Sequence, residues 1–157
     1  MAFAEKRKLA AGILAIAKDT GRILLARRSF DGDDHEGEWS FFGGGLEDDE
    51  LPKAGAIREF QEETNFGGTP ETKGKKFLLT KMPFYTKNGN HVKYFTYIGI
   101  FDNEFVVDLM HEKNFENSHY GWFHLDKLPE ALHPGVKEVV EEKYDEIQKR
   151  IDFYCNL

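Results

Sequence analysis

Runs of apolar residues that alternate with polar residues predict two β-hairpins in this chain. The apolar segment 8–17 is separated from segment 22–28 by Lys18-Asp19-Thr20-Gly21, whose residue types favour a tight turn. Segments 76–86 and 91–101 are rich in aromatic residues and flank an Asn-Gly pair, which is the strongest short hairpin signal between apolar strands. Shorter apolar stretches predict further strands at 39–42 and 120–124.

Two segments show helical periodicity instead. A helix that opens at Glu50 places Ala56, Ile57 and Phe60 on one side, with Pro52 in its first turn, where proline is tolerated. Segment 136–153 carries apolar residues at the spacing of an amphipathic helix, with His133-Pro134-Gly135 as the break before it. The order of strands, helix, strands and helix predicts an α/β domain with a mixed sheet. A length of 157 residues fits one domain spanning 1–157.

The N-terminal apolar segment allows two interpretations. A basic stretch at 5–8, followed by an apolar run that ends in Ala15-Ile16-Ala17, imitates a secretory signal. The alternative is a buried strand. We favour the strand, because cleavage after Ala17 would remove the partner of segment 22–28.

The net charge, the apolar content and the cysteine content indicate which binding partners and which cellular setting to expect. The net charge of −7 argues against general nucleic-acid binding, which needs Lys and Arg against the phosphates, and suits a protein that holds phosphates through divalent cations. No apolar run reaches the length of a membrane span, so no membrane partner is expected. The single Cys155 cannot form an intramolecular disulfide, which favours a reduced, cytoplasmic setting.

Three glutamates define the main candidate for chemistry. Glu59, Glu62 and Glu63 stand at i, i+3 and i+4, so a helix brings them together on one face. Mg²⁺ binds a few carboxylates together with substrate phosphates, whereas the plainer alternative is a solvated acidic helix face. A glycine run precedes this helix and leaves its backbone open to a phosphate. Arg58, four residues before Glu62, can orient that carboxylate.

Two further segments are candidates for contact with a phosphate or a metal ion. Arg27 and Arg28 end a predicted strand, and one of them is expected to face a phosphate; a solvated strand end is the alternative. The loop 29–38 begins like an EF-hand at Asp31, but it lacks glycine at the sixth position and has Phe42 at the twelfth. This loop is therefore expected to be a surface loop beside the site.

The helix and its flanks resemble a known family motif. Gly44, five residues, Glu50, seven residues and then Arg58-Glu59-Phe60-x-Glu62-Glu63-x-Asn65-Phe66 is similar to the Nudix box. Asn65 replaces the glycine of the box at a position expected to be left-handed, where Asn is the next-best residue. A second departure is Phe42, where many members have proline.

This resemblance implies a fold and an activity. The fold is a three-layer α/β/α sandwich with helices on both faces of a mixed sheet. The activity is hydrolysis of the pyrophosphate bond in a nucleoside diphosphate linked to another group, with Mg²⁺ or Mn²⁺ as cofactor and a nucleotide-derived substrate. The implied metal ligands are the carbonyl of Gly43 with Glu59, Glu62, Glu63 and Glu116. The strand end and the glycine run supply the expected substrate contacts, which are Arg27, Arg28, Gly44 and Gly45.

The general base is the least defined role. Candidates beyond the box are Glu104, Glu112 and Glu116, and Glu116 is preferred because it precedes Tyr120-x-Trp122, as in similar family members. The expected catalytic residues are then Glu62, Glu116 and Arg58, with a base inside the box as the alternative. A non-catalytic nucleotide-binding module on the same fold is the competing function, and a homodimer is left open.

Overall fold

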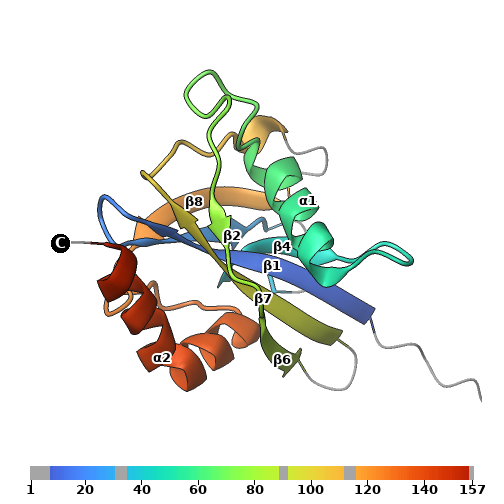
Figure 1. The fold of residues 1–157 in the computed structure, drawn as a ribbon. Helices are drawn as coiled ribbons and strands as arrows, with labels where there is room; N and C mark the ends of the chain where they lie inside the picture. The colour runs from blue at the N-terminus through green and yellow to red at the C-terminus, as the bar shows by residue number, and fades with distance from the viewer. Residues whose placement is uncertain (1–7, 31–34, 89–91, 112–115, 156–157) are drawn as a thin grey trace, which may run out of the picture.

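A computed structural model describes residues 8–30, 35–88, 92–111 and 116–155 (Figure 1). Its strands form one mixed sheet, and their bounds are β1 Lys8–Ala17, β2 Ile23–Arg28, β3 Trp39–Ser40, β4 Phe42–Gly45, β5 Leu78–Leu79, β6 Phe84–Asn88, β7 Val92–Phe101 and β8 Asn117–Phe123. The helices are α1 Pro52–Thr64, α2 Pro134–Tyr154 and a 3-10 turn, η1, at Leu109–His111.

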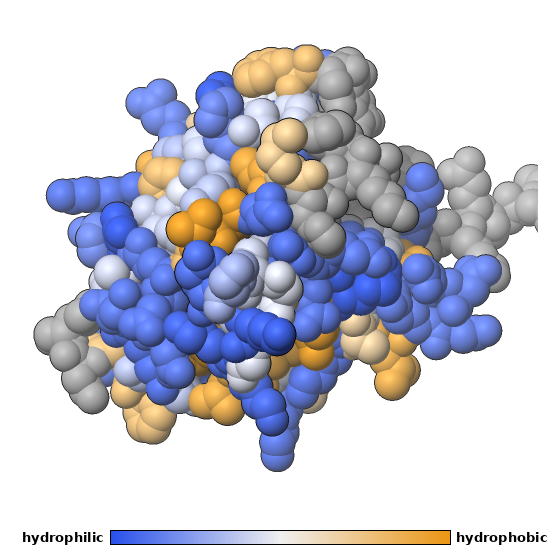
Figure 2. Space-filling model, turned by 90° about the horizontal axis from the view of Figure 1, so that it is seen from above, coloured by the Kyte–Doolittle hydropathy of each residue, from blue (hydrophilic) through white to orange (hydrophobic). Residues whose placement is uncertain are grey.

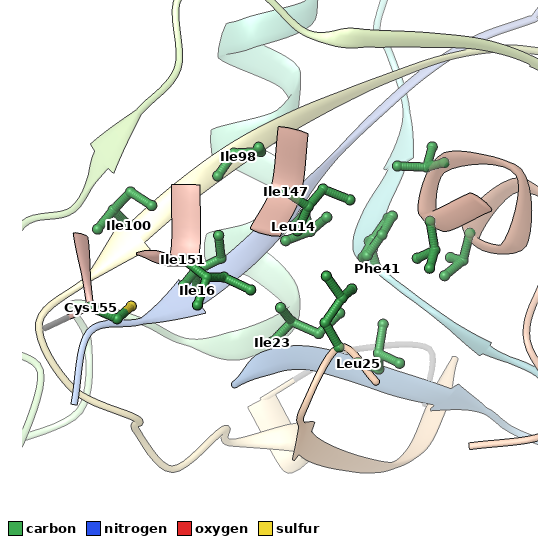
Figure 3. Packing of buried hydrophobic residues seen from close by; sticks show 14 residues of the cluster. Leu14, Ile16, Ile23, Leu25, Phe41, Ile98, Ile100, Ile147, Ile151 and Cys155 are labelled. Atoms are coloured by element: carbon green, nitrogen blue, oxygen red, sulfur yellow. The ribbon is translucent and has the colours of Figure 1, made fainter. Parts of the chain in front are cut away.

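The two α-helices cover opposite faces of the sheet. Successive side chains of a strand point to opposite faces. In β1, Ile13 therefore belongs to the cluster with Phe60 of α1, whereas Leu14 belongs to the cluster with Ile147 of α2. Figure 3 shows the second cluster, in which apolar residues of α2 meet those of the strands. This arrangement confirms the predicted α/β/α sandwich.

The sheet opens into a wedge between β1 and β2. The whole of β1 pairs in parallel with β7 along one edge, and β2 and β4 share its other edge. At that edge β1 pairs with β2 at Ile16 and with β4 at residues 10–13. Further along, β2 pairs with β3 instead, at Ala26 and Arg27. Segment 39–45 thus crosses from β2 to β1 and fills the gap between them.

Several predicted boundaries are confirmed and others are wrong. Segment 8–17 is a central buried strand, as favoured above. Segment 76–86 is not one strand, because β5 and β6 pair separately with the same edge of β7. Segment 39–42 is also divided, since its two halves pair with different strands. Segment 120–124 starts earlier than predicted, at Asn117.

The two ends of α1 give one correction and one confirmation. The helix begins at Pro52 after Leu51, so Glu50 does not open the helix as predicted but precedes it. Asn65 ends the helix with a φ of 58°, in the left-handed region, and its N–H donates to Gln61 O at 2.9 Å. The substitution of Asn for Gly therefore preserves the helix end.

The face of the molecule seen from above in Figure 2 is mainly hydrophilic. Figure 2 shows one face on which hydrophilic residues dominate and hydrophobic residues gather in small groups. Among the described residues, no helix is both long enough and apolar enough to cross a bilayer.

Phe60 is the central aromatic residue of the α1 face. It is fully buried and its ring contacts those of Phe42, Phe66, Phe101 and others. Removal of a buried Phe side chain costs about 3–5 kcal/mol. We therefore expect Phe60→Ala to lower the free energy of unfolding, measured in urea, by about that amount.

The matched control is Phe153→Ala, since the Phe153 side chain is 76% exposed. This change should stay within about 0.5 kcal/mol of the parent protein. Equal losses for the two variants would show that the α1 face is not packed as described.

Candidate active site

One guanidinium group organises the acidic residues of α1 and of the loop before it. Arg58 donates to Glu50 through Nε at 2.8 Å and through Nη2 at 2.9 Å, a bidentate pair. Its Nη1 donates to Glu59 at 3.0 Å and to Glu62 at 3.2 Å. Its Nη2 also donates to the carbonyl of Gly45 at 3.1 Å. Arg58 thus joins the helix to the glycine strand, and it contacts Glu62 as its spacing predicted.

The Arg58 pair sets the ionisation of Glu50. The hydrogen bonds from Arg58, then that from the Glu47 N–H, lower the pKa of Glu50 to about 2. The hydrogen bonds and charges of the surrounding carboxylates, those of Glu50 first, raise the pKa of Arg58. Both groups therefore stay charged at neutral pH.

Glu63 has a different environment from the other glutamates of the box. It is buried, and its carboxylate accepts from the Gly43 N–H at 3.1 Å and from Asn117 Nδ2 at 2.8 Å. Asn117 lies at the start of β8, 54 positions after Glu63 in the chain, so the fold alone brings the two residues together. Sequence reasoning missed Asn117, because nothing in a polar residue before a strand signals such a contact.

The three box glutamates do not point to one place as predicted. Arg58 draws Glu59 and Glu62 toward itself, whereas Glu63 turns into the wedge of the sheet. Across the described ranges, no three acidic, His or Cys side chains converge closely enough to hold a metal ion.

The surroundings of Glu59 nevertheless fit a cation. Burial raises the pKa of Glu59, and the like charges of Glu62 and Glu116 add to the rise against the effect of Arg58. A buried carboxylate among like charges favours a cation nearby. Hard oxygen donors of this kind, with the Gly43 carbonyl at the wedge, suit Mg²⁺ or Mn²⁺.

The glycines of β4 provide the space for these side chains. A Cβ on Gly44 would lie 2.6 Å from Glu59 Oε2, so the absence of a side chain at Gly44 lets the Glu59 carboxylate lie against the strand in this position. Gly45 is exposed, and a Cβ there would meet nothing within 4 Å. Gly44 therefore has a packing requirement, while Gly45 contributes its carbonyl to Arg58.

A pocket of about 70 Å³ adjoins Glu63 on the α2 side of the wedge. Its walls come from several elements and include Arg28, Ser40, Gly43, Glu63, Tyr94, Thr96, Asn117 and His133. Of the two candidate arginines, the structure brings Arg28 to this pocket. The Arg27 guanidinium instead donates to the Gly37 carbonyl at 3.2 Å and lies 5.0 Å from the Phe30 ring centroid.

His133 forms the boundary between this pocket and α2. Its Nδ1 accepts from the Gly135 N–H at 3.0 Å and caps the helix. Burial, then the charge of His35, lowers the pKa of His133 to about 4, so the ring is neutral at pH 7. Because Nδ1 accepts, the proton of the neutral ring is on Nε2.

Two of the three candidate bases, Glu116 and Glu104, have different surroundings in the structure. Glu116 is exposed beside the site, close enough for its charge to raise the pKa of Glu59. Glu104 is bound by Arg22 in a bidentate pair at 2.6 Å, at the β1–β2 turn. Glu112 lies outside the described residues. Of the two described candidates, only Glu116 contributes to the electrostatics of the box.

Comparison with known proteins identifies the family of this chain. A family model described as the NUDIX domain matches residues 6–143. The chain therefore belongs to the Nudix family, and it is a hydrolase acting on phosphoric anhydrides. Members of the family generally use divalent cations. No curated protein matches the chain.

Solved structures share the fold at low sequence identity. A Nudix hydrolase from M. smegmatis, RenU, is 20% identical with a TM-score of 0.69, over 91% of this chain and 87% of that one. A MutT protein from Methanosarcina mazei Go1 is 22% identical with a TM-score of 0.66, over 92% and 98%. A C. elegans Ap4A hydrolase is 19% identical with a TM-score of 0.66, over 90% and 98%.

The depressed pKa of Glu50 predicts a specific loss of stability in acid. Because its pKa falls from 4.5 to about 2 on folding, the Arg58 pair stabilises the fold fully above pH 4.5. That stabilisation is lost as the pH falls toward 2. We expect Glu50→Gln to be less stable at pH 7 and to lose less stability over this pH range, as measured by thermal unfolding.

Glu47→Gln is the matched control, because Glu47 is exposed and lies 3.8 Å from the same guanidinium. It should follow the pH dependence of the parent protein. A Glu50→Gln variant that keeps the parental slope would disprove the coupling.

Proposed function

We propose that this protein is a Mg²⁺-dependent hydrolase that cleaves the pyrophosphate bond of a nucleoside diphosphate linked to another group. The observation that carries the proposal is the position of the glutamates around Arg58, against a glycine strand and beside a pocket with Arg28. This arrangement provides carboxylates for a cation and a guanidinium for phosphates within one wedge of the sheet.

Several residues of the chain have proposed roles in that reaction. Glu59, Glu62 and Glu63 and the Gly43 carbonyl hold the cation, and Arg58 fixes the orientation of Glu59 and Glu62. When bound, the cation neutralises the phosphate oxygens and makes a water molecule more acidic. Glu116, an exposed carboxylate, completes the metal site and accepts the proton of the attacking water.

Substrate contacts are proposed on the pocket side. Arg28 lines the pocket and presents a planar donor fork that matches a phosphate group. Gly44 and Gly45 keep β4 free of side chains where a phosphate approaches. We leave Arg27 out of the proposed contacts, because its guanidinium lies over Phe30.

The substrate class is open among nucleoside triphosphates, nucleotide sugars and dinucleoside polyphosphates. The last class has support from the fold neighbour described as an Ap4A hydrolase. The decisive experiment is a panel with one member of each class, ADP-ribose and GDP-mannose included, incubated with Mg²⁺ and analysed by chromatography. Hydrolysis of at least one member is expected, whereas binding without turnover would favour a non-catalytic nucleotide-binding module.

The first prediction for this function concerns the cation. Because Glu59 is half-buried among like charges, we expect its site to need a divalent ion for activity. EDTA should abolish hydrolysis, and excess Mg²⁺ or Mn²⁺ should restore it. Full turnover in EDTA would contradict the metal-dependent mechanism.

The second prediction concerns the base. General-base assistance contributes about 10²- to 10⁴-fold, so Glu116→Gln should lower kcat by roughly that factor with a much smaller change in substrate affinity. Glu104→Gln supplies the control: it weakens the pair with Arg22 but should leave kcat nearly unchanged. If Glu116→Gln retains full kcat, the base lies inside the box, and Glu59 and Glu62 are tested next.

A further inference from the structure

Tyr94 of β7 reaches across the sheet to the strand that carries Gly43. A Cβ placed on Gly12 would lie 3.4 Å from Tyr94 Cε1, and one placed on Gly43 would lie 2.9 Å from the Tyr94 hydroxyl oxygen. Gly12 and Gly43 are register partners in the β1–β4 pair. The tyrosine ring therefore lies over a cross-strand pair that has no side chains, and its hydroxyl group ends at the wedge.

The hydroxyl oxygen of Tyr94 lies close to Gly43, which also lines the pocket beside the box. Tyr94 lines this pocket together with Arg28, Gly43 and Glu63. The volume of about 70 Å³ is several times the ~10–15 Å³ that one water molecule needs, so the pocket has room for a phosphoryl group.

Glu63 is oriented by hydrogen bonds from residues other than Tyr94. The two oxygens of Glu63 accept from the Gly43 N–H and from Asn117 Nδ2, so the carboxylate is oriented without the tyrosine. A phenol is protonated at neutral pH and is a hydrogen-bond donor. Beside Arg28, it adds an uncharged O–H donor to a pocket that adjoins the proposed metal ligands.

We propose that Tyr94 positions the substrate by donating its O–H to a non-bridging oxygen of the diphosphate. This assignment rests on the proposed function, which places the diphosphate between the glutamates and Arg28. The ring alone would cover the glycine pair equally well as phenylalanine. The hydroxyl group is therefore the part of the residue whose role is recognition.

The same strand provides a matched control. Tyr97 lies on the opposite face of β7, buried in the cluster with Phe60 of α1. Tyr94→Phe and Tyr97→Phe each remove one phenolic oxygen from a tyrosine of β7. Only the first change removes a donor from the pocket.

The test measures binding independently of turnover. Methylenediphosphonate, a diphosphate with a non-hydrolysable bridge, is titrated calorimetrically into each protein in the presence of Mg²⁺. Because a hydrogen bond to a charged group is lost, Tyr94→Phe should weaken binding about 10- to 100-fold. With any substrate that the panel identifies, KM should rise by a similar factor while kcat changes little. Tyr97→Phe should match the parent in both measurements, and both variants should keep the parental unfolding midpoint.

The outcomes separate this inference from the proposed function. Parental affinity in Tyr94→Phe, equal losses in the two variants, or no binding of methylenediphosphonate by the parent protein would overturn the role of Tyr94. If the parent protein hydrolyses no panel member yet binds methylenediphosphonate in a Tyr94-dependent way, the proposed hydrolysis fails. The diphosphate contact then stands.

Discussion

The site depends on the way in which one guanidinium balances the carboxylates around it. Glutamates at i, i+3 and i+4 repel one another on a helix. Arg58 offsets this repulsion by bonding Glu59 and Glu62, and its bidentate pair with Glu50 anchors it to the loop before α1. Its bond to the Gly45 carbonyl ties the helix to β4. The hydrogen bonds of Arg58 thus hold the carboxylates proposed for cation binding and also offset their repulsion on the helix.

The second requirement is the wedge between β1 and β2. If these strands stayed paired along their length, Gly43 of β4 could not reach β1, and Glu63 would lose the N–H donor that orients it. The opening also brings β8 within reach, through Asn117, and leaves space for the pocket that Arg28 and Tyr94 line. The topology of the sheet, rather than the helix alone, therefore creates a site with a carboxylate side and a donor side.

Local features were the ones that the sequence could predict. The contact of Arg58 with Glu62 and the left-handed end at Asn65 depend on neighbours within a turn or two of helix. The burial of Phe60 follows from its place in the apolar pattern of the helix. The three carboxylates of the box do not converge in this structure, because Glu59 and Glu62 bond Arg58 of the same helix, whereas Glu63 bonds partners on β4 and β8. Asn117 and Tyr94 could not be found in the same way, since each lies on a strand that only the fold brings to the site, as the 54 positions between Asn117 and Glu63 show.

The most direct test of this account is a crystal structure with Mn²⁺ and methylenediphosphonate, in which anomalous scattering locates the metal. The account predicts Mn²⁺ bound by the carboxylates of Glu59, Glu62 and Glu63 and by the carbonyl of Gly43, with the diphosphate extending toward Arg28. Mn²⁺ bound away from α1, or a diphosphate bound with no metal at these oxygens, would contradict it.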